Sequence, residues 1–407
     1  MPDRRPPAAV AVVALLLIAS AAARGAAGEP TPASGDGTPV PLRLEAPPSG
    51  VRGPGAAAER AVLQAFLDEH PHVRVEPHTK LRMAGPRGEA TLYMAMAAQT
   101  APDALLVYAR SMQKYIEQDF LYPLDEYITD ELRADPMFQK LLPAISRDGH
   151  VYGLPAHVAV HALLYRKDLF ADAGLDPDQP PRTWDELLDY SRRLTFPEKS
   201  QFGMLLEGGG LAGWRFCNYV WQAGGDVVRQ QPDGSWRLTL DEPPAVAALT
   251  LLRELRWGSW QRDGVTLTGA ARVDSAGLGG AYFRDGRAAM MVVSTTEDVG
   301  RYVTDPTVVG LAPLPAGPAG DATMIEAEFW GISNLLRDDP ARRAAAWQYI
   351  RFLTSERARR VRARVYVESG WPQNVAPRDL ERFGYHDELA RLPRAWLTLY
   401  DNLARDG

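Results

Sequence analysis

The sequence predicts an α/β protein with two domains, and three observations carry this expectation. At 407 residues the chain is long enough to form two hydrophobic cores. Between residues 41 and 107, apolar strand-like runs alternate with helix-like segments, which is the pattern of parallel strands joined by crossover helices. Farther along, the stretch Asp148–Leu175 holds an apolar run long enough to leave one structural unit as a strand and enter another.

The N-terminal residues indicate export. Residues 8–23 are rich in Ala and Leu, follow Arg4 and Arg5, and precede a run of small residues. This pattern predicts a secretory signal peptide over residues 1–27, although a retained N-terminal anchor is the alternative. Residues 28–40 are rich in Pro, Gly, Ser and Thr, and we interpret them as a flexible tail. We therefore expect a periplasmic or secreted protein.

The composition excludes some classes of function. The formal net charge is −6, and a mildly acidic exported protein is not built to bind nucleic acid. The single cysteine, Cys217, rules out an intrachain disulfide, and we expect its thiol to pack in a core.

Apolar periodicity and turn residues predict the strands and helices of the chain. Thr183 before an amphipathic run, with Glu186 three residues on, is a capping-box signature. The expected strands are Pro41–Glu45, His70–Glu76, Ala101–Val107, His157–Tyr165 and Phe202–Leu206. The expected helices are Ala56–Glu69, Tyr93–Gln99, Trp184–Thr195, Trp214–Ala223 and Pro243–Trp257.

Several short motifs appear in one order along the chain. YGLP at Tyr152–Pro155 is followed by LLYRKDLF at Leu163–Phe170 and by TWDEL at Thr183–Leu187. FLYPLDEY precedes them, and AYFRDGRAAMMVV and AAWQYIRFLTSE follow. This order, over roughly residues 41–375, resembles the extracellular solute-binding proteins of ABC importers. Among these it looks like the sugar-binding type 1 family that includes the maltose-binding proteins.

The resemblance implies a two-lobe periplasmic-binding-protein fold of the type II kind. Each lobe would be a mostly parallel sheet flanked by helices, with a ligand cleft between them. Crossings near residues 156–160, 289–294 and 353–357 would separate lobe 1 (41–156 plus 294–354) from lobe 2 (157–293 plus 355–407). Relatives that are lipid-anchored carry a cysteine at the cleavage site. This chain has none there, so we expect no lipid anchor.

The resemblance also implies what the protein does. It would capture a sugar by hinge closure, as a monomer, and deliver it to the transmembrane subunits of an ABC permease. It would not be an enzyme, and it would need no cofactor or metal.

The candidate ligand-binding residues lie where the family places its cleft, and they suit a sugar. Aromatic rings stack on the C–H faces of sugars, and carboxylates, hydroxyls and arginine bind their hydroxyl groups. Alternation on a strand would place Glu326, Glu328 and Trp330 on one face. The full set is Tyr108, Arg110, His157, Trp214, Trp221, Ser294, Thr295, Glu326, Glu328, Trp330 and Trp371.

Other interpretations of these residues stay open. Paired carboxylates do acid–base work in glycosidases, so a secreted carbohydrate-active enzyme using Glu326 or Glu328 is the alternative function. His70, His72 and His78 lie close in sequence, but their spacing suits a solvated surface better than a metal site. The basic run from Arg357 to Arg364 reads as a solvated helix face.

Overall fold

The computed structural model describes residues 38–45, 53–77, 89–274, 279–295, 299, 302–303, 305, 307–393 and 396–397. The predicted signal peptide and nearly all of the predicted tail lie outside these residues. Within them, every helix is too short or too polar to cross a lipid bilayer.

The chain divides into two compact units. Of the described residues, those from 38 to Val158, together with Glu326–Leu389, form what we call the N-terminal unit. The described residues of Ala159–Ile325, together with those after Leu389, form what we call the central unit. The first division lies two residues from the predicted boundary at 156/157. The other two, after Ile325 and Leu389, come later in the chain than the boundaries proposed after residues 293 and 354.

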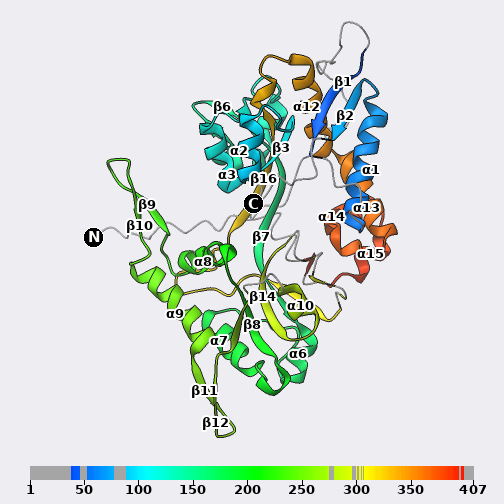
Figure 1. Cartoon of the computed structure of the whole chain (residues 1–407). Helices are drawn as coiled ribbons and strands as arrows, with labels where there is room; N and C mark the ends of the chain where they lie inside the picture. The colour runs from blue at the N-terminus through cyan, green and yellow to red at the C-terminus, as the bar shows by residue number, and fades with distance from the viewer. Residues whose placement is uncertain are drawn as a thin grey trace, which may run out of the picture. The chain divides into compact units, whose positions relative to one another are not determined.

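Strand and helix pairing explains why the later divisions differ. β14 (Ala288–Ser294) and β15 (Val309–Ala312) both pair with the part of β7 (Leu154–Arg166) that lies in the central unit, so both strands stay in that unit. The helix α13 (Glu356–Glu368) packs on α1 (Pro54–Glu69) of the N-terminal unit instead of opening a second lobe (Figure 1).

The N-terminal unit is a small α/β body. β1 and β2 pair in parallel across the crossover helix α1, as the sequence predicted, and α1 turns Ala58, Val62 and Phe66 into the core. β3 pairs with β16 in an antiparallel manner instead. Its strands are β1 (Val40–Leu44), β2 (Val73–Pro77), β3 (Ala104–Tyr108), β4 (Leu121–Tyr122), β5 (Ser146–Arg147), β6 (His150–Val151) and nearly all of β16 (Ile325–Ser333). Its helices are α1, α2 (Glu89–Ala97), α3 (Ala109–Glu117), α4 (Asp130–Ala134), α5 (Pro136–Ile145), η2 (Asn334–Leu336), α12 (Pro340–Leu353), α13, η3 (Pro372–Asn374), α14 (Pro377–Arg382) and the start of α15 (His386–Arg391).

The central unit is built on the sheet order β13-β8-β14-β7, in which β13, β8 and β14 run parallel and β7 runs against them. All seven residues of β14 are buried, because the strand lies between β8 and β7. The strands are β7, β8 (Phe202–Glu207), β9 (Val228–Gln230), β10 (Trp236–Leu238), β11 (Ser259–Arg262), β12 (Val265–Thr268), β13 (Ala271–Asp274), β14 and β15. The helices are α6 (Lys167–Asp172), α7 (Trp184–Arg193), η1 (Pro197–Lys199), α8 (Gly210–Gln222), α9 (Pro243–Trp257) and α10 (Gly279–Arg284).

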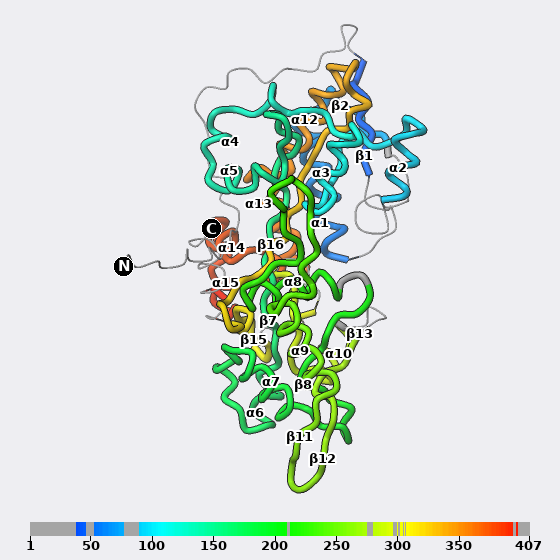
Figure 2. The backbone as a smooth tube through the Cα atoms, turned by 90° about the vertical axis from the view of Figure 1, so that its left-hand side faces the viewer, coloured from blue at the N-terminus to red at the C-terminus, as the bar shows by residue number. Residues whose placement is uncertain are grey.

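Local sequence signals set several element ends. Thr183 caps α7 by accepting a hydrogen bond from Glu186 N at 3.2 Å, which confirms the predicted cap. Gly209, at φ 64° and ψ −144°, caps α8 in a conformation that side-chain-bearing residues avoid. The hairpin β11–β12 projects from the body of the central unit in both views (Figures 1 and 2).

Candidate ligand-binding site

The strand β16 carries the first group of candidate residues in the N-terminal unit. Ala327 and Phe329 are buried, whereas Glu326, Glu328 and Trp330 are half-buried on the opposite face. The predicted alternation is therefore confirmed. Trp330 meets the ring of Tyr349 edge to face at 6.3 Å between centroids, which orients the indole.

The end of β3 brings two more candidates to this strand. Tyr108 is the last residue of β3 and lies directly opposite Glu328 in the antiparallel register. The Arg110 guanidinium, on the first turn of α3, lies 4.4 Å above the Tyr108 ring, a cation–π arrangement that restrains it. A carboxylate, a guanidinium and an aromatic ring thus meet at a strand end, where the ligand sites of open α/β sheets lie.

A second group lies in the central unit, around α8 and the end of β14. Half-buried Glu207 at the end of β8 forms an ion pair with buried Arg215 of α8, with 2.5 Å between Oε2 and Nε. Ser294 and Thr295 are buried, and Thr295 Oγ1 accepts a hydrogen bond from Val160 N at 3.2 Å. The structure thus gives Thr295 a structural bond that the sequence did not reveal.

The two tryptophans of α8 are half-buried. They lie seven residues apart, two turns along the helix, and so share a face. Trp221 Nε1 donates a hydrogen bond to Asp226 at 3.0 Å, so this indole is anchored at the C-terminal end of α8. Cys217 on the same helix is half-buried instead of packed in the core.

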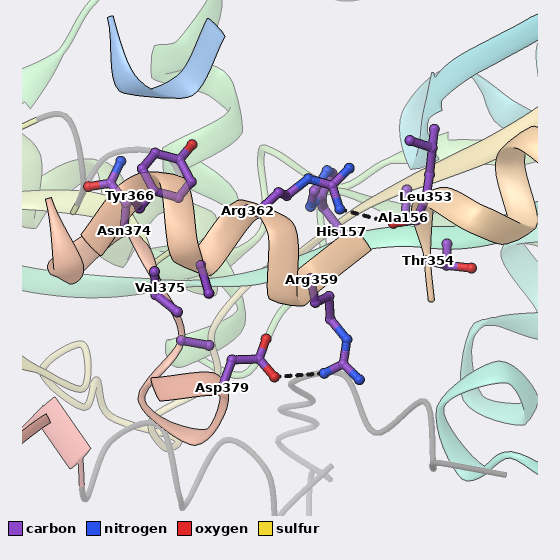
Figure 3. A pocket seen from close by; sticks show the side chains of 12 residues that line it. Ala156, His157, Leu353, Thr354, Arg359, Arg362, Tyr366, Asn374, Val375 and Asp379 are labelled. Atoms are coloured by element: carbon purple, nitrogen blue, oxygen red, sulfur yellow. Dashed lines mark hydrogen bonds and ion pairs between the residues drawn. The ribbon is translucent and has the colours of Figure 1, made fainter. Parts of the chain in front are cut away.

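His157 lies on β7, one residue before the chain leaves the N-terminal unit. It is an exposed side chain that lines a cavity of about 170 Å³ within this unit (Figure 3). Partial desolvation of the ring by the surrounding protein, and secondarily the charge of Arg362, lower the pKa of His157. Its imidazole is therefore neutral at pH 7.

Trp371 lies in the same part of the N-terminal unit, at the start of η3. It is half-buried, and its backbone N–H donates to Tyr366 O at 2.8 Å. Tyr366 and Asn374 line the cavity beside it.

Sequence reasoning missed two residues of this cavity, Arg359 and Arg362 of α13. We interpreted their basic run as a solvated helix face, and for these two side chains that interpretation is wrong. Arg359 forms an ion pair with Asp379 at 2.8 Å, and Arg362 forms one with Glu59 at 2.8 Å. Their spacing of three residues was the available signal, because it places both on adjacent turns of one helix face.

The arrangement suits binding. Half-buried carboxylates accept strong, charge-assisted hydrogen bonds from hydroxyl groups, and the aromatic rings offer faces for C–H groups. Within the described ranges, no cluster of three or more His, Cys, Asp or Glu side chains has the geometry to hold a metal ion. His72 contacts Gln348 at 3.2 Å, His70 stacks on Phe66 at 4.4 Å between centroids, and His78 lies outside those ranges.

Comparison with known proteins agrees with this picture. The family model for bacterial extracellular solute-binding proteins matches residues 49–360, well over half of the chain. A maltotriose-binding protein of Pyrococcus abyssi is 25% identical over 320 residues, which are 73% of this chain and 60% of that protein. The chain spans about three fifths of the length of the first curated relatives that it matches, and less of others.

Two solved structures share the fold. UgpB of Mycobacterium tuberculosis in complex with glycerophosphocholine has a TM-score of 0.66 at 21% identity, covering 91% of this chain and 93% of that chain. An ABC substrate-binding protein of Listeria monocytogenes in complex with cycloalternan has a TM-score of 0.65 at 20% identity, covering 91% and 95%. The two-lobe α/β fold expected from the sequence is confirmed, and the chain belongs to the family of bacterial extracellular solute-binding proteins.

Proposed function

We propose that this protein is the substrate-binding component of an ABC importer, and that its ligand is a sugar or oligosaccharide. It acts outside the cytoplasmic membrane and as a monomer. It hands its ligand to the transmembrane permease and neither makes nor breaks a bond. Support comes from the family and from the names of relatives, which include a maltotriose-binding protein.

The observation that carries the proposal is the polar face of β16. Glu326, Glu328 and Trp330 share that face, and Glu328 lies opposite Tyr108, which holds Arg110 over its ring. Hydroxyl groups satisfy such carboxylates and guanidinium groups, and the indole supplies a face for sugar C–H groups. We assign Tyr108, Arg110, Glu326, Glu328 and Trp330 to the ligand.

The remaining candidates belong to the same proposal. We assign them as ligand contacts of the central unit or of the region of the N-terminal unit around β7 and η3. They are His157, Trp214, Trp221, Ser294, Thr295 and Trp371.

Calorimetry tests the proposal. Maltose, maltotriose and glycerophosphocholine are titrated into the full chain, while tryptophan fluorescence reports a change around the indoles. Saturable binding of a sugar with no product after long incubation is the expected result. Release of a hydrolysis product, abolished by Glu326→Gln or Glu328→Gln, would instead support the carbohydrate-active enzyme. Binding of glycerophosphocholine alone would move the ligand class from sugars to phosphodiesters.

A further inference from the structure

The helix α8 carries two buried amide side chains next to its two tryptophans. Asn218 lies four residues after Trp214 and three before Trp221, so it neighbours both on the helix surface. Its side chain is buried, and the protein encloses it on all sides. Gln222, one turn farther along the helix, is buried as well. The two amides thus lie directly behind the residues that we assign to the ligand in the central unit.

Asn218 joins three parts of the central unit. Its Oδ1 accepts a hydrogen bond from Met324 N at 2.7 Å. Its Nδ2 donates to His161 Nδ1 on β7 at 2.8 Å and to Arg215 O on α8 at 3.0 Å. Because the backbone N–H of Met324 can only donate, it fixes the orientation of the Asn218 amide, and His161 Nδ1 is therefore an acceptor.

Further hydrogen bonds hold the residues around Met324. Gln222 Nε2 donates to Ala322 O at 3.0 Å. Thr323 Oγ1 donates to His161 O at 2.9 Å, and His161 N donates to Met324 O at 3.1 Å. Three consecutive residues are therefore held between α8 and β7. In a buried network of this kind, removing one partner leaves another polar group unsatisfied, so the arrangement is rigid.

The network lies where the chain passes between its two units. His161 follows Val158, the residue at which β7 leaves the N-terminal unit, and Met324 precedes Glu326, at which β16 returns to it. We call residues 159–163 and 322–326 the crossing segments. Since α8 is bonded to both, and since a densely packed interior transmits strain, a displacement of α8 is passed to both crossing segments.

We propose that Asn218 is a positioning residue of the ligand site, which fastens α8 to the two crossing segments with the help of Gln222. A ligand that stacks on Trp214 or Trp221 orders α8, and the network conveys this order to the crossing segments. Ligand contact and hinge closure are thereby coupled. The coupling to a ligand rests on the function proposed above, whereas the fastening is a property of the ligand-free protein.

The test compares three forms of the full chain. Asn218→Leu keeps the volume of the side chain and removes its donor and acceptor; Asn218→Ser, which is smaller and polar, serves if the leucine variant does not fold. Gln201→Leu is the matched control, because Gln201 is another buried amide of the central unit and donates to Leu194 O at 2.8 Å instead of to a crossing segment. Urea denaturation gives the stability of each form.

Hydrogen–deuterium exchange without ligand tests the fastening. Asn218→Leu should raise the exchange rate in both crossing segments about tenfold, the effect of one lost hydrogen bond, because local opening becomes easier. Gln201→Leu should leave the exchange of these segments as in the parent protein. Equal exchange in the parent and in Asn218→Leu would overturn the inference, whatever the ligand is.

Stopped-flow tryptophan fluorescence with maltose and maltotriose tests the coupling. Asn218→Leu should release the sugar about tenfold faster at an unchanged association rate, because the tryptophans still meet the ligand but the closed form is held less tightly. An unchanged release rate, or the same acceleration in Gln201→Leu, would overturn the inference. If neither sugar binds the parent protein, the sugar assignment of the proposed function fails instead, and the exchange measured without ligand decides the inference.

Discussion

Replacing Glu328 by Gln tests the assignment of β16 most directly. The substitution keeps the shape of the side chain and removes its charge, so it converts a charge-assisted hydrogen bond to a sugar hydroxyl into a neutral one. Losing such a bond costs about 1.5–3 kcal/mol, which corresponds to roughly a tenfold to hundredfold weaker affinity. Glu328 qualifies for this range because it is half-buried and lies beside Tyr108 at the strand end.

The stability of the ligand-free protein should barely change. Glu328 is not enclosed, and Gln fills the same space, so we expect the free energy of unfolding to change by less than about 1 kcal/mol. Calorimetry with the best sugar gives the affinity, and urea denaturation gives the stability. Glu198→Gln is the control, because Glu198 is exposed on η1 of the central unit.

A substitution of Trp330, on the same face of β16 as Glu328, gives a second test of whether this face binds the sugar. Trp330→Phe shortens the stacking surface but keeps an aromatic ring against Tyr349, which Trp330→Ala would not. We expect it to weaken sugar binding as well. If both Glu328→Gln and Trp330→Phe bind the sugar as tightly as the parent, β16 does not belong to the site.

Three further outcomes follow from the fold. Asp103→Ala should lower the free energy of unfolding by about 1–3 kcal/mol in a denaturant titration, because buried Asp103 accepts hydrogen bonds from Arg342 at 2.6 Å and from Arg43 N at 2.8 Å; an unchanged free energy of unfolding would contradict this. Gly203→Ala should destabilise by more than about 1 kcal/mol in thermal melts, since its Cβ would lie 2.0 Å from Ser191 O, whereas Gly213→Ala, with no atom within 4 Å, should not. Because the pKa of His157 is lower in the folded protein than its ordinary value of 6.5, the unfolded chain binds a proton more readily, so stability falls as the pH drops below 6.5. His157→Gln should flatten this part of the melting-temperature profile, and an unchanged profile would refute the assignment.

The predictions that succeeded rest on patterns local in sequence. Period-two alternation placed Glu326, Glu328 and Trp330 on one face, because side chains of a strand alternate wherever it pairs. The continuous apolar run of β7 was also recognised as a strand, because such a run needs no distant partner to be seen. Cap chemistry fixed the start of α7 for the same reason, since the cap and its partner lie three residues apart.

The predictions that failed depend on partners distant in sequence. β14 is as apolar as β7, so its sequence predicts a buried strand. The sequence does not predict that the strand pairs with β8 on one side and β7 on the other within a single sheet. We predicted that Arg359 and Arg362 of α13 are solvated, because their acidic partners lie on other helices and are not apparent from the sequence around them. These partners are Asp379 and Glu59. Periodicity identifies a face, but only the tertiary structure identifies what covers it.

The packing of α1 on α13 has a consequence for the order of folding. Glu59 and Arg362 are hydrogen-bonded although they lie 303 residues apart in the sequence. The N-terminal unit therefore cannot complete its packing until the chain beyond α12 has been synthesised. Most of the central unit is one continuous segment and is complete sooner. Long-range closure of this kind slows folding, because the entropy of a large loop is lost before its contacts form. The helix α1 therefore completes its native packing only after α13 has been made, although it comes early in the chain.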